Sequence, residues 1–482
     1  MGCFESFSTM PTQQLLRLAI AFFLLTPFTC DTPSKETNLL TLPLKYRAEI
    51  LDPLYAVDES TAFVVNFLQR RLYTYTPEGA LIPDLVSSET RQGHRIVIQM
   101  KENTASADDV VYALTRVARD ANQAWVMEQI RSVKKIAPRQ VEILLHQSDR
   151  PAKTDWMLAK IKLTLPQCAI FRANEHKARG TFVPFSNYRI QEQTGDRILL
   201  RGINNYPSIQ FLAMPDETAR YFAFREARLD VYEALGIHRK LPYDSTRYEQ
   251  QTMYDLVVLY AAMHVPKKSA LAQSSLRRAI NLAFNRKALC EKTLLEACVP
   301  ADYPVPSVLS SPPKENFPAS EEFVLPKEIE TVTLFTLGDK ERILIAQYMR
   351  SIFERFRIRL EFRIVDIPSM VRESNKGTHG IYLMKWAADY PHAENFIVPL
   401  FYSKNAGIGG NRAHIKDALL DNLIERASYT PENTARIQQR IRYLSPWIFI
   451  GFQNMQFYRL KSSPIRIPKI FAGWSERVIK PK

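Results

Sequence analysis

The sequence predicts an α/β protein with more than one lobe. The chain has 482 residues, which is longer than the range in which one hydrophobic core keeps growing. Hydrophobic residues make up 46 % of the chain and aromatic residues 11 %, which is enough for packed cores and argues against disorder. Strand-like and helix-like segments alternate along the chain, as expected when helices cover a sheet.

The clearest observation behind this fold class is a strand–helix–strand unit within residues 332–366. The segment 332–337 reads as a strand, and Asp339 after it is a suitable N-cap for a helix. A second strand follows at 360–364 after a short turn, so we expect the two strands to be parallel neighbours. The predicted buried face of the helix consists of Ile345, Met349, Ile352 and Phe356.

Other elements are predicted from caps and apolar spacing. Ser106 and Asp109 form a capping-box pattern at the start of a helix. Apolar residues three and four apart predict a helix over 275–289, and Thr430 before Pro431 marks the start of another. Strand patterns dominate from 130 to 205.

Charge and motifs exclude several function classes. The formal charge is +14, but the basic residues are spread over the chain and no Lys/Arg run exceeds two residues, so we expect no nucleic-acid partner. The sequence has no nucleophile elbow, no phosphate-binding glycine loop and no His-Glu-x-x-His motif. We therefore expect no enzyme activity, no cofactor and no metal site.

The N-terminus predicts export. Arg17 precedes an apolar run over 18–25 that is too short to span a bilayer, and Cys30 follows it. We expect residues 1–29 to be a signal peptide and Cys30 to be acylated, with simple cleavage nearby or an uncleaved anchor as the alternatives. Residues 30–45 would then be a polar tether. Of the remaining cysteines, Cys290 and Cys298 are close enough to pair, but the spacing leaves their pairing open.

One carboxylate raises a question that the local sequence leaves open. In "KWAADYPHAENF", residues 385–396, Asp389 stands between Ala387-Ala388 and Tyr390. A carboxylate beside so much apolar surface is costly if it is buried without a partner. Either Asp389 is solvated in a turn before Pro391, or it pairs with a cation that the protein does not supply.

This segment and six others resemble one protein family. "WAADYPHAENFIVPLFYSKN", followed by "NRAHI" from Asn411, is similar to a segment of bacterial extracellular solute-binding proteins of the oligopeptide- and dipeptide-binding class, the substrate-binding lipoproteins of ABC importers. Segments in the same order that also resemble this family lie at 51–53, 107–116, 187–207, 217–231, 275–289 and 445–452.

The resemblance implies a bilobal α/β fold of the type II periplasmic-binding-protein class with an additional subdomain. It places lobe I at 46–57, 180–255 and 458–482, the appended subdomain at 58–179, and lobe II at 256–457.

The resemblance also implies a function. A periplasmic, lipid-anchored monomer would bind short peptides between its lobes and deliver them to an inner-membrane permease. Asp389 would pair with the α-ammonium group of the peptide. The other ligand-binding residues that it implies are Trp386, Ala387, Ala388, Tyr390 and Asn411.

Three departures from the family pattern and two alternatives accompany this interpretation. Leu383 stands where some relatives carry an Arg for the carboxylate of the ligand, and His392-Ala393 replaces the usual Asp-Pro. A further departure is the segment "MKENTASADD", which shortens the family's Phe-x-x-Gly-x-Pro approach to the helix at 107–116. The same fold could bind another small solute, such as a metal chelate, haem, glutathione or a sugar. A surface lipoprotein that binds a protein partner without transport is the alternative from another class. The retained Trp-Ala-Ala-Asp pattern favours peptides.

Overall fold

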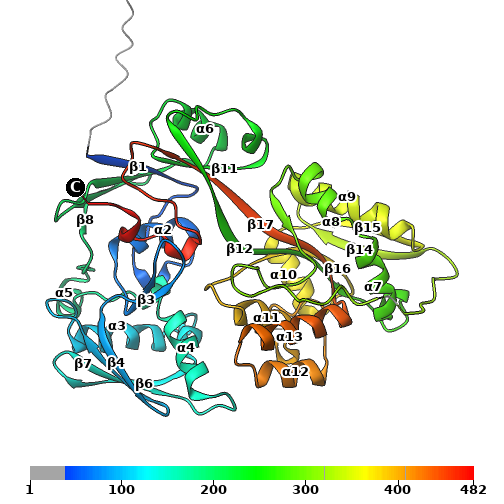
Figure 1. The fold of residues 1–482 in the computed structure, drawn as a ribbon, viewed down its shortest axis with the longest axis horizontal. Coiled ribbons are helices and arrows are strands. Elements are labelled where there is room, and N and C mark those ends of the chain that lie inside the picture. The colour runs from blue at the N-terminus through cyan, green and yellow to red at the C-terminus, as the bar shows by residue number, and fades with distance from the viewer. Residues whose placement is uncertain (1–37, 320, 408, 482) are drawn as a thin grey trace, which may run out of the picture. The chain divides into compact units, whose positions relative to one another are not determined.

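The computed structural model describes residues 38–319, 321–407 and 409–481, and in these ranges the chain forms four β-sheets with helices packed on them (Figure 1). The predicted signal peptide at 1–29 and the predicted acylation site at Cys30 lie outside the described residues.

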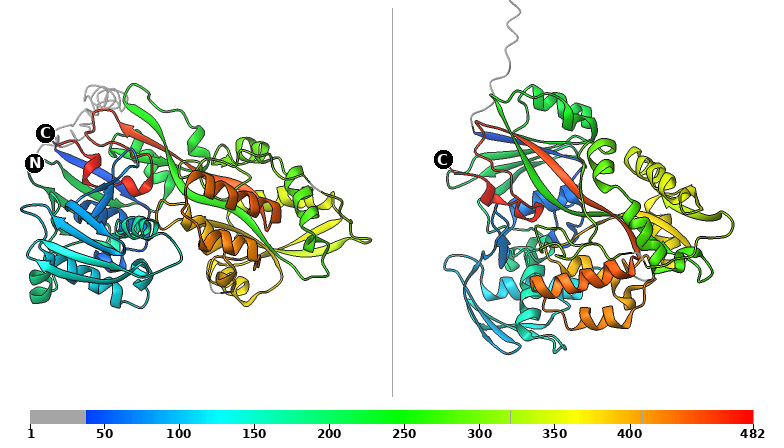
Figure 2. Two further views of the ribbon diagram at one scale, coloured as in Figure 1. Left: turned by 60° about the horizontal axis from the view of Figure 1, so that its bottom comes forward. Right: turned by 45° about the vertical axis from the view of Figure 1, so that its right-hand side comes forward.

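The largest sheet is built on two long antiparallel strands, β12 (Tyr248–His264) and β17 (Trp447–Leu460). Figures 1 and 2 show them side by side in every view. The strand order is β11 (Val231–Ala234), β17, β12, β16 (Gly380–Ala387), β14 (Glu330–Thr336) and β15 (Ile358–Ile364), and β13 (Cys298–Pro300) also pairs with β17.

The predicted strand–helix–strand unit is confirmed. β14 and β15 are parallel, with Val332 opposite Leu360, and α9 (Lys340–Glu354) connects them. The Asp339 carboxylate accepts a hydrogen bond from the N–H of Arg342 and so caps α9. Ile345, Met349 and Ile352 are buried, which gives α9 the inward face that the apolar spacing predicts. Phe356, the fourth residue predicted for this face, follows the end of the helix and is only partly buried against the same cluster.

The middle part of β12 is covered by helices on both faces. Alternate residues of the strand belong to two buried apolar clusters, so that Leu259 and Ala261 lie in one and Val258 and Tyr260 in the other. The first cluster includes residues of α7 (Ser274–Ala283) and α9. The second includes residues of α10 (Ile367–Lys376), α11 (Glu394–Phe401), α12 (Ala418–Glu425) and α13 (Pro431–Leu444).

A four-stranded sheet contains the first described strand, which corrects one prediction. β1 (Leu39–Leu44) pairs with β10 (Ser208–Ala213), followed by β9 (Arg197–Gly202) and β8 (Tyr188–Gln193). Leu40, Leu42 and Leu44 are buried against α2 (Glu59–Leu68). The tether predicted over 30–45 is therefore wrong for residues 39–44, because these alternating leucines form a strand.

A second four-stranded sheet follows along the chain. Its order is β4 (Val86–Gln92), β5 (Arg95–Met100), β7 (Gln140–Leu145) and β6 (Ile130–Ala137). α3 (Ala107–Arg119) packs on it and begins with the predicted capping box of Ser106 and Asp109. The remaining elements are the hairpin of β2 (Tyr73–Tyr75) and β3 (Leu81–Pro83), α4 (Ala152–Lys162), α5 (Ala173–Arg179), α6 (Glu217–Arg225) and α8 (Arg286–Ala288).

The helix predicted over 275–289 is shorter than expected. α7 ends at Ala283, because Phe284 takes an extended conformation and the Asn285 side chain caps the new turn at Ala288. The segment after it contains a disulfide between Cys290 and Cys298, which answers the question that the spacing left open.

Ile352→Asp should destabilise the fold severely. The substitution places an unpaired charge in the cluster under α9, so we expect the free energy of unfolding to fall by more than about 3 kcal/mol. Urea unfolding followed by circular dichroism measures the change. Ser351→Asp, on the exposed side of the same helix, is the matched control and should cost less than about 1 kcal/mol. Equal effects at both positions would contradict the assigned packing face.

Candidate functional site

The candidate site is a cavity of about 550 Å³. This volume lies in the range of about 300–1,000 Å³ that is usual for small-molecule sites. Parts of the chain far apart in sequence line it: α2 and the turn before it, the turns Ala124–Met127 and Pro166–Cys168, β12, residues 387–391, β17, and the turn Phe471–Gly473.

The pairing of β12 with β16 brings Asp389 to this cavity. The strands are antiparallel with Val257 opposite Ala387, and the N–H of Ala388 donates to the carbonyl of Leu256 at 2.8 Å. Asp255 directly precedes Leu256, and Asp389 directly follows Ala388. Both Asp residues line the cavity. The end of the paired region therefore supplies two carboxylates to the same space.

Asp389 is exposed to the cavity, but the surrounding walls reduce its hydration. Burial raises the pKa of its carboxyl above the usual value, against the opposing effects of Asn395 and Lys162. The Asn395 side chain fixes the turn: its Oδ1 accepts from the Asp389 N–H at 2.9 Å, and its Nδ2 lies 3.4 Å from Asp389 Oδ2. Among the described residues, no Lys, Arg or His lies within ion-pair distance of this carboxylate.

Tyr390 anchors the Asp389 segment in a different part of the structure. It is buried in the apolar cluster formed by residues 54–171, and its ring stacks on Trp125 with 6.4 Å between the ring centroids. The buried Lys162 ammonium lies 5.5 Å from the centroid of each of these two rings and pairs with Glu128. The Tyr390 hydroxyl donates to the buried carboxyl of Glu394.

The other predicted site residues divide into two groups. Ala387 and Ala388 line the cavity together with Asp389 and Tyr390. Trp386 lies behind them: its indole N–H donates to the Asn395 carbonyl at 2.9 Å, and a Cβ atom at Gly410 would lie only 3.1 Å from its ring.

Asn411 is not brought to the cavity. It is buried, its amide donates to the carbonyls of Tyr402 and Ile415, and its Oδ1 accepts from the Ile415 N–H. These bonds use its polar atoms to hold the glycine-containing loop in place. Asn411 therefore has a structural position, and the expectation that it contacts ligand receives no support from its location.

Asp255 is a site residue that the sequence analysis missed. Gln453 Nε2 donates to its carboxylate at 2.7 Å. Burial raises the pKa of Asp255 to about 7, and the nearby carboxylates Glu233 and Glu59 add to the increase, while Lys45 and Lys385 oppose it. The available signal was a single Asp directly before the apolar run of β12, comparable to Asp389, which stands two residues after the end of β16.

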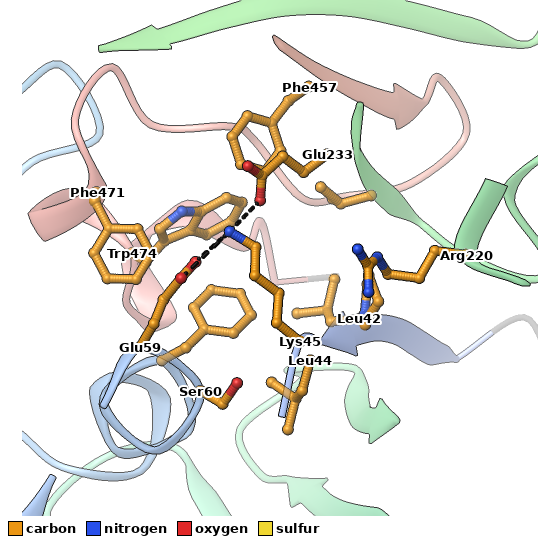
Figure 3. Close-up of a pocket in the computed structure, with 13 residues that line it drawn as sticks. Leu42, Leu44, Lys45, Glu59, Ser60, Arg220, Glu233, Phe457, Phe471 and Trp474 are labelled. Carbon is orange, nitrogen blue, oxygen red and sulfur yellow. Dashed lines mark hydrogen bonds and ion pairs between the residues drawn. The ribbon is translucent and has the colours of Figure 1, made fainter. Parts of the chain in front are cut away.

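A small pocket of about 60 Å³ shares Lys45, Glu59 and Phe471 with the main cavity. In Figure 3 the Lys45 ammonium lies between Glu59 and Glu233, at 3.0 and 2.8 Å from their carboxylates. Burial alone would lower the pKa of Lys45, but these two carboxylates outweigh that effect and raise it. Burial raises the pKa of Glu233.

The described ranges contain no helix that is long and apolar enough to cross a membrane. They also contain no group of three or more His, Cys, Asp or Glu side chains arranged to hold a metal ion.

Comparison with protein families decides the class of this chain. Residues 103–407 match the model of the middle part of the bacterial extracellular solute-binding proteins, family 5, which is more than half of the chain. The chain belongs to this family. Its members are the binding proteins of ABC importers and are not enzymes, and the predicted resemblance is confirmed.

Individual relatives agree with the family. The probable di/tripeptide-binding protein 5 of Pseudomonas aeruginosa is 22 % identical over 388 residues, which cover 70 % of this chain and 71 % of that protein. The Escherichia coli murein tripeptide binding protein MppA superposes with a TM-score of 0.69 at 16 % identity, over 92 % of this chain and 98 % of MppA.

A third relative was solved with a peptide. DppA of Helicobacter pylori, in complex with the peptide STSA, has a TM-score of 0.70 at 14 % identity, over 92 % of this chain and 98 % of DppA. At these identities the solved structures establish the fold, and the predicted type II periplasmic-binding-protein fold is confirmed.

The raised pKa of Asp255 should make the folding stability of the ligand-free protein depend on pH. The folded state holds this proton up to about pH 7, whereas an unfolded Asp releases it near pH 4, so wild type loses stability as pH rises between these values. Asp255→Asn cannot lose that proton. We expect its melting temperature to match that of wild type at pH 4 and to be higher than that of wild type at pH 8. At pH 8 the difference in unfolding free energy should be about 1–3 kcal/mol after solvent screening.

Thermal melts of both proteins at pH 4, 6 and 8 measure this difference. Asp366→Asn is the control for the loss of one charge. Hydrogen bonds from Ser369 at this exposed helix N-cap lower the pKa of Asp366, so this variant should lose stability relative to wild type as pH rises, which is the opposite sign. A difference between Asp255→Asn and wild type that does not grow with pH would contradict the assigned environment of Asp255.

Proposed function

We propose that this protein binds short peptides in the 550 Å³ cavity and that Asp389 pairs with their α-ammonium group. The observation that carries the proposal is a carboxylate that faces the cavity, has a raised pKa and has no cation of the protein in ion-pair contact among the described residues. The family, and the names of relatives that are peptide-binding proteins, support a peptide as the ligand.

Lys162 does not take the place of the ligand ammonium. Its effect on the pKa of Asp389 is smaller than the effect of burial, and its ammonium is already paired with Glu128 and lies close to two aromatic rings. A ligand ammonium about 4 Å from Asp389 would gain roughly 4 kcal/mol at an effective dielectric constant of about 20, before the cost of desolvation.

The carboxyl end of the peptide has no dedicated cation at the position that some relatives use. Leu383 is buried in the apolar cluster under α9, so its side chain points into the protein core. Affinity is therefore expected to depend on the amino end of the peptide more than on the carboxyl end.

The transport role follows from the family. We propose that the protein is exported to the periplasm, is anchored there through acylated Cys30, acts as a monomer, and delivers peptides to an inner-membrane permease of an ABC importer. The family assignment supports this role, and the short apolar run before Cys30 supports export.

Asp389→Asn should weaken peptide binding strongly. Removing one partner from a desolvated charge pair costs roughly 2–5 kcal/mol, which is about 30- to 4000-fold in the dissociation constant. N-acetylation of the peptide deletes the same interaction, so it should weaken binding to wild type by a similar factor and scarcely change binding to the variant. Amidation of the C-terminus should matter less.

Isothermal titration calorimetry with a tripeptide, in its free, N-acetylated and C-amidated forms, measures these effects. Asp366→Asn, at a position that does not line the cavity, is the control for the loss of one charge. Equal binding of free and acetylated peptide by wild type would rule out the proposed role of Asp389.

Acylation of Cys30 can be tested separately. We expect the intact mass of the membrane fraction to correspond to a chain that begins at Cys30 and carries a diacylglycerol group. Cys30→Ser should leave the membrane and keep the melting temperature of wild type. A mature N-terminus at another residue would reject the lipid anchor and leave the peptide proposal intact.

A further inference from the structure

The charge of the cavity is opposite to the charge of the protein. The chain has a formal charge of +14, yet the cavity lining contains four carboxylates, namely Asp58, Glu59, Asp255 and Asp389, and one basic residue, Lys45. Lys45 is already bound to Glu59 and to Glu233. Above about pH 7, where Asp255 has lost its proton, the interior of the site is therefore anionic, and a cationic ligand would be attracted to it.

The cations that face Asp255 from neighbouring elements are committed elsewhere. Lys385 donates to Glu341 at 2.7 Å and to the Gln453 side chain, and Lys45 lies between Glu59 and Glu233. The partner of Asp255 that the structure records is the neutral Gln453. This carboxylate thus lines the cavity without a cation in ion-pair contact among the described residues.

Glu233, in the small pocket next to the cavity, also has fewer positively charged or hydrogen-bonding partners than its carboxylate could accept. Its Oε1 is buried and has no hydrogen-bond partner among the described residues, although Oε2 pairs with Lys45 at 2.8 Å. Arg220 lines the same pocket, but its guanidinium donates to the carbonyls of Met214 and Pro215. A buried carboxylate oxygen without a donor is costly, and additional positive charge nearby would reduce that cost.

The pairing of β12 with β16 brings Asp255 and Asp389 to the same cavity. The paired region ends at Leu256 and Ala388, each Asp is the next residue along its segment, and both line the cavity. One residue of a ligand could therefore place its α-ammonium at Asp389 and its side chain at Asp255.

We infer that Asp255, with Glu59 and Glu233 behind it, forms a second cation subsite that selects peptides whose first residue is basic. The inference rests on the proposed function and specifies the class of peptide. The ammonium or guanidinium group of a Lys or Arg side chain would pair with Asp255. The aliphatic part of that side chain would pack along the apolar lining near Leu256, Val257 and Phe471.

The test compares peptides that differ only in charge. Calorimetry at pH 8 with Lys-Ala-Ala, norleucine-Ala-Ala and Glu-Ala-Ala separates the side-chain charge from its length. Because a hydrogen-bonded charge pair in a partly desolvated site is stronger than a neutral contact, we expect wild type to bind the lysine peptide about 10- to 100-fold more tightly than the norleucine peptide. The glutamate peptide should bind most weakly.

Two variants test whether Asp255 causes the preference for the lysine peptide. Asp255→Asn should reduce the lysine preference to about 3-fold or less while it still binds the norleucine peptide, because Asp389 is intact. Asp366→Asn should keep the wild-type preference. If Asp255→Asn fails to fold, the comparison of the three peptides on wild type still decides whether the site selects positive charge.

The outcomes separate this inference from the function on which it rests. Equal binding of the lysine and norleucine peptides by wild type overturns the subsite and leaves peptide binding in place. A lysine preference that survives Asp255→Asn overturns the assignment to Asp255. Failure of wild type to bind any of the three peptides overturns both the subsite and the proposed function.

Discussion

The antiparallel pairing of β12 with β16 is the constraint on which the site depends. Residues of β12 alternate between two buried clusters, which fixes the strand and leaves it no freedom to shift its register by one residue. With this register fixed, the paired region ends at Leu256 and Ala388. The two carboxylates just beyond it face a cavity, where they keep part of their hydration, instead of entering a core where they would have no partner.

Features with a local cause were predictable from the sequence. The caps at Ser106, Asp339 and Thr430 lie where the sequence places them, because a side chain three residues from a free N–H needs no distant partner. The position of Asp389 at a cavity was predictable for a related reason. A carboxylate among apolar residues must contact either water or a cation. The parallel pair around α9 followed from the short turns that join its three pieces.

Features that depend on distant contacts were not predictable. Asn411 in a glycine-containing loop resembles a ligand contact until the carbonyls that accept its hydrogen bonds are known. Asp255 before an apolar run cannot be told from an ordinary solvent-exposed strand end, because its environment comes from Glu59, Glu233 and Gln453, which are far away in sequence. The leucines of β1 were assigned to the predicted tether at 30–45 because polar residues dominate the first part of that segment.

The position of Tyr390 links the width of the cavity to proton uptake. Any motion that widens the cavity between Trp125 and residues 387–391 has to separate the two stacked rings and admit water to Lys162 and Glu394. Burial raises the pKa of Glu394 in the present arrangement, and hydration would lower it again. Contact between the two walls at Tyr390 therefore favours the protonated form of this buried carboxyl.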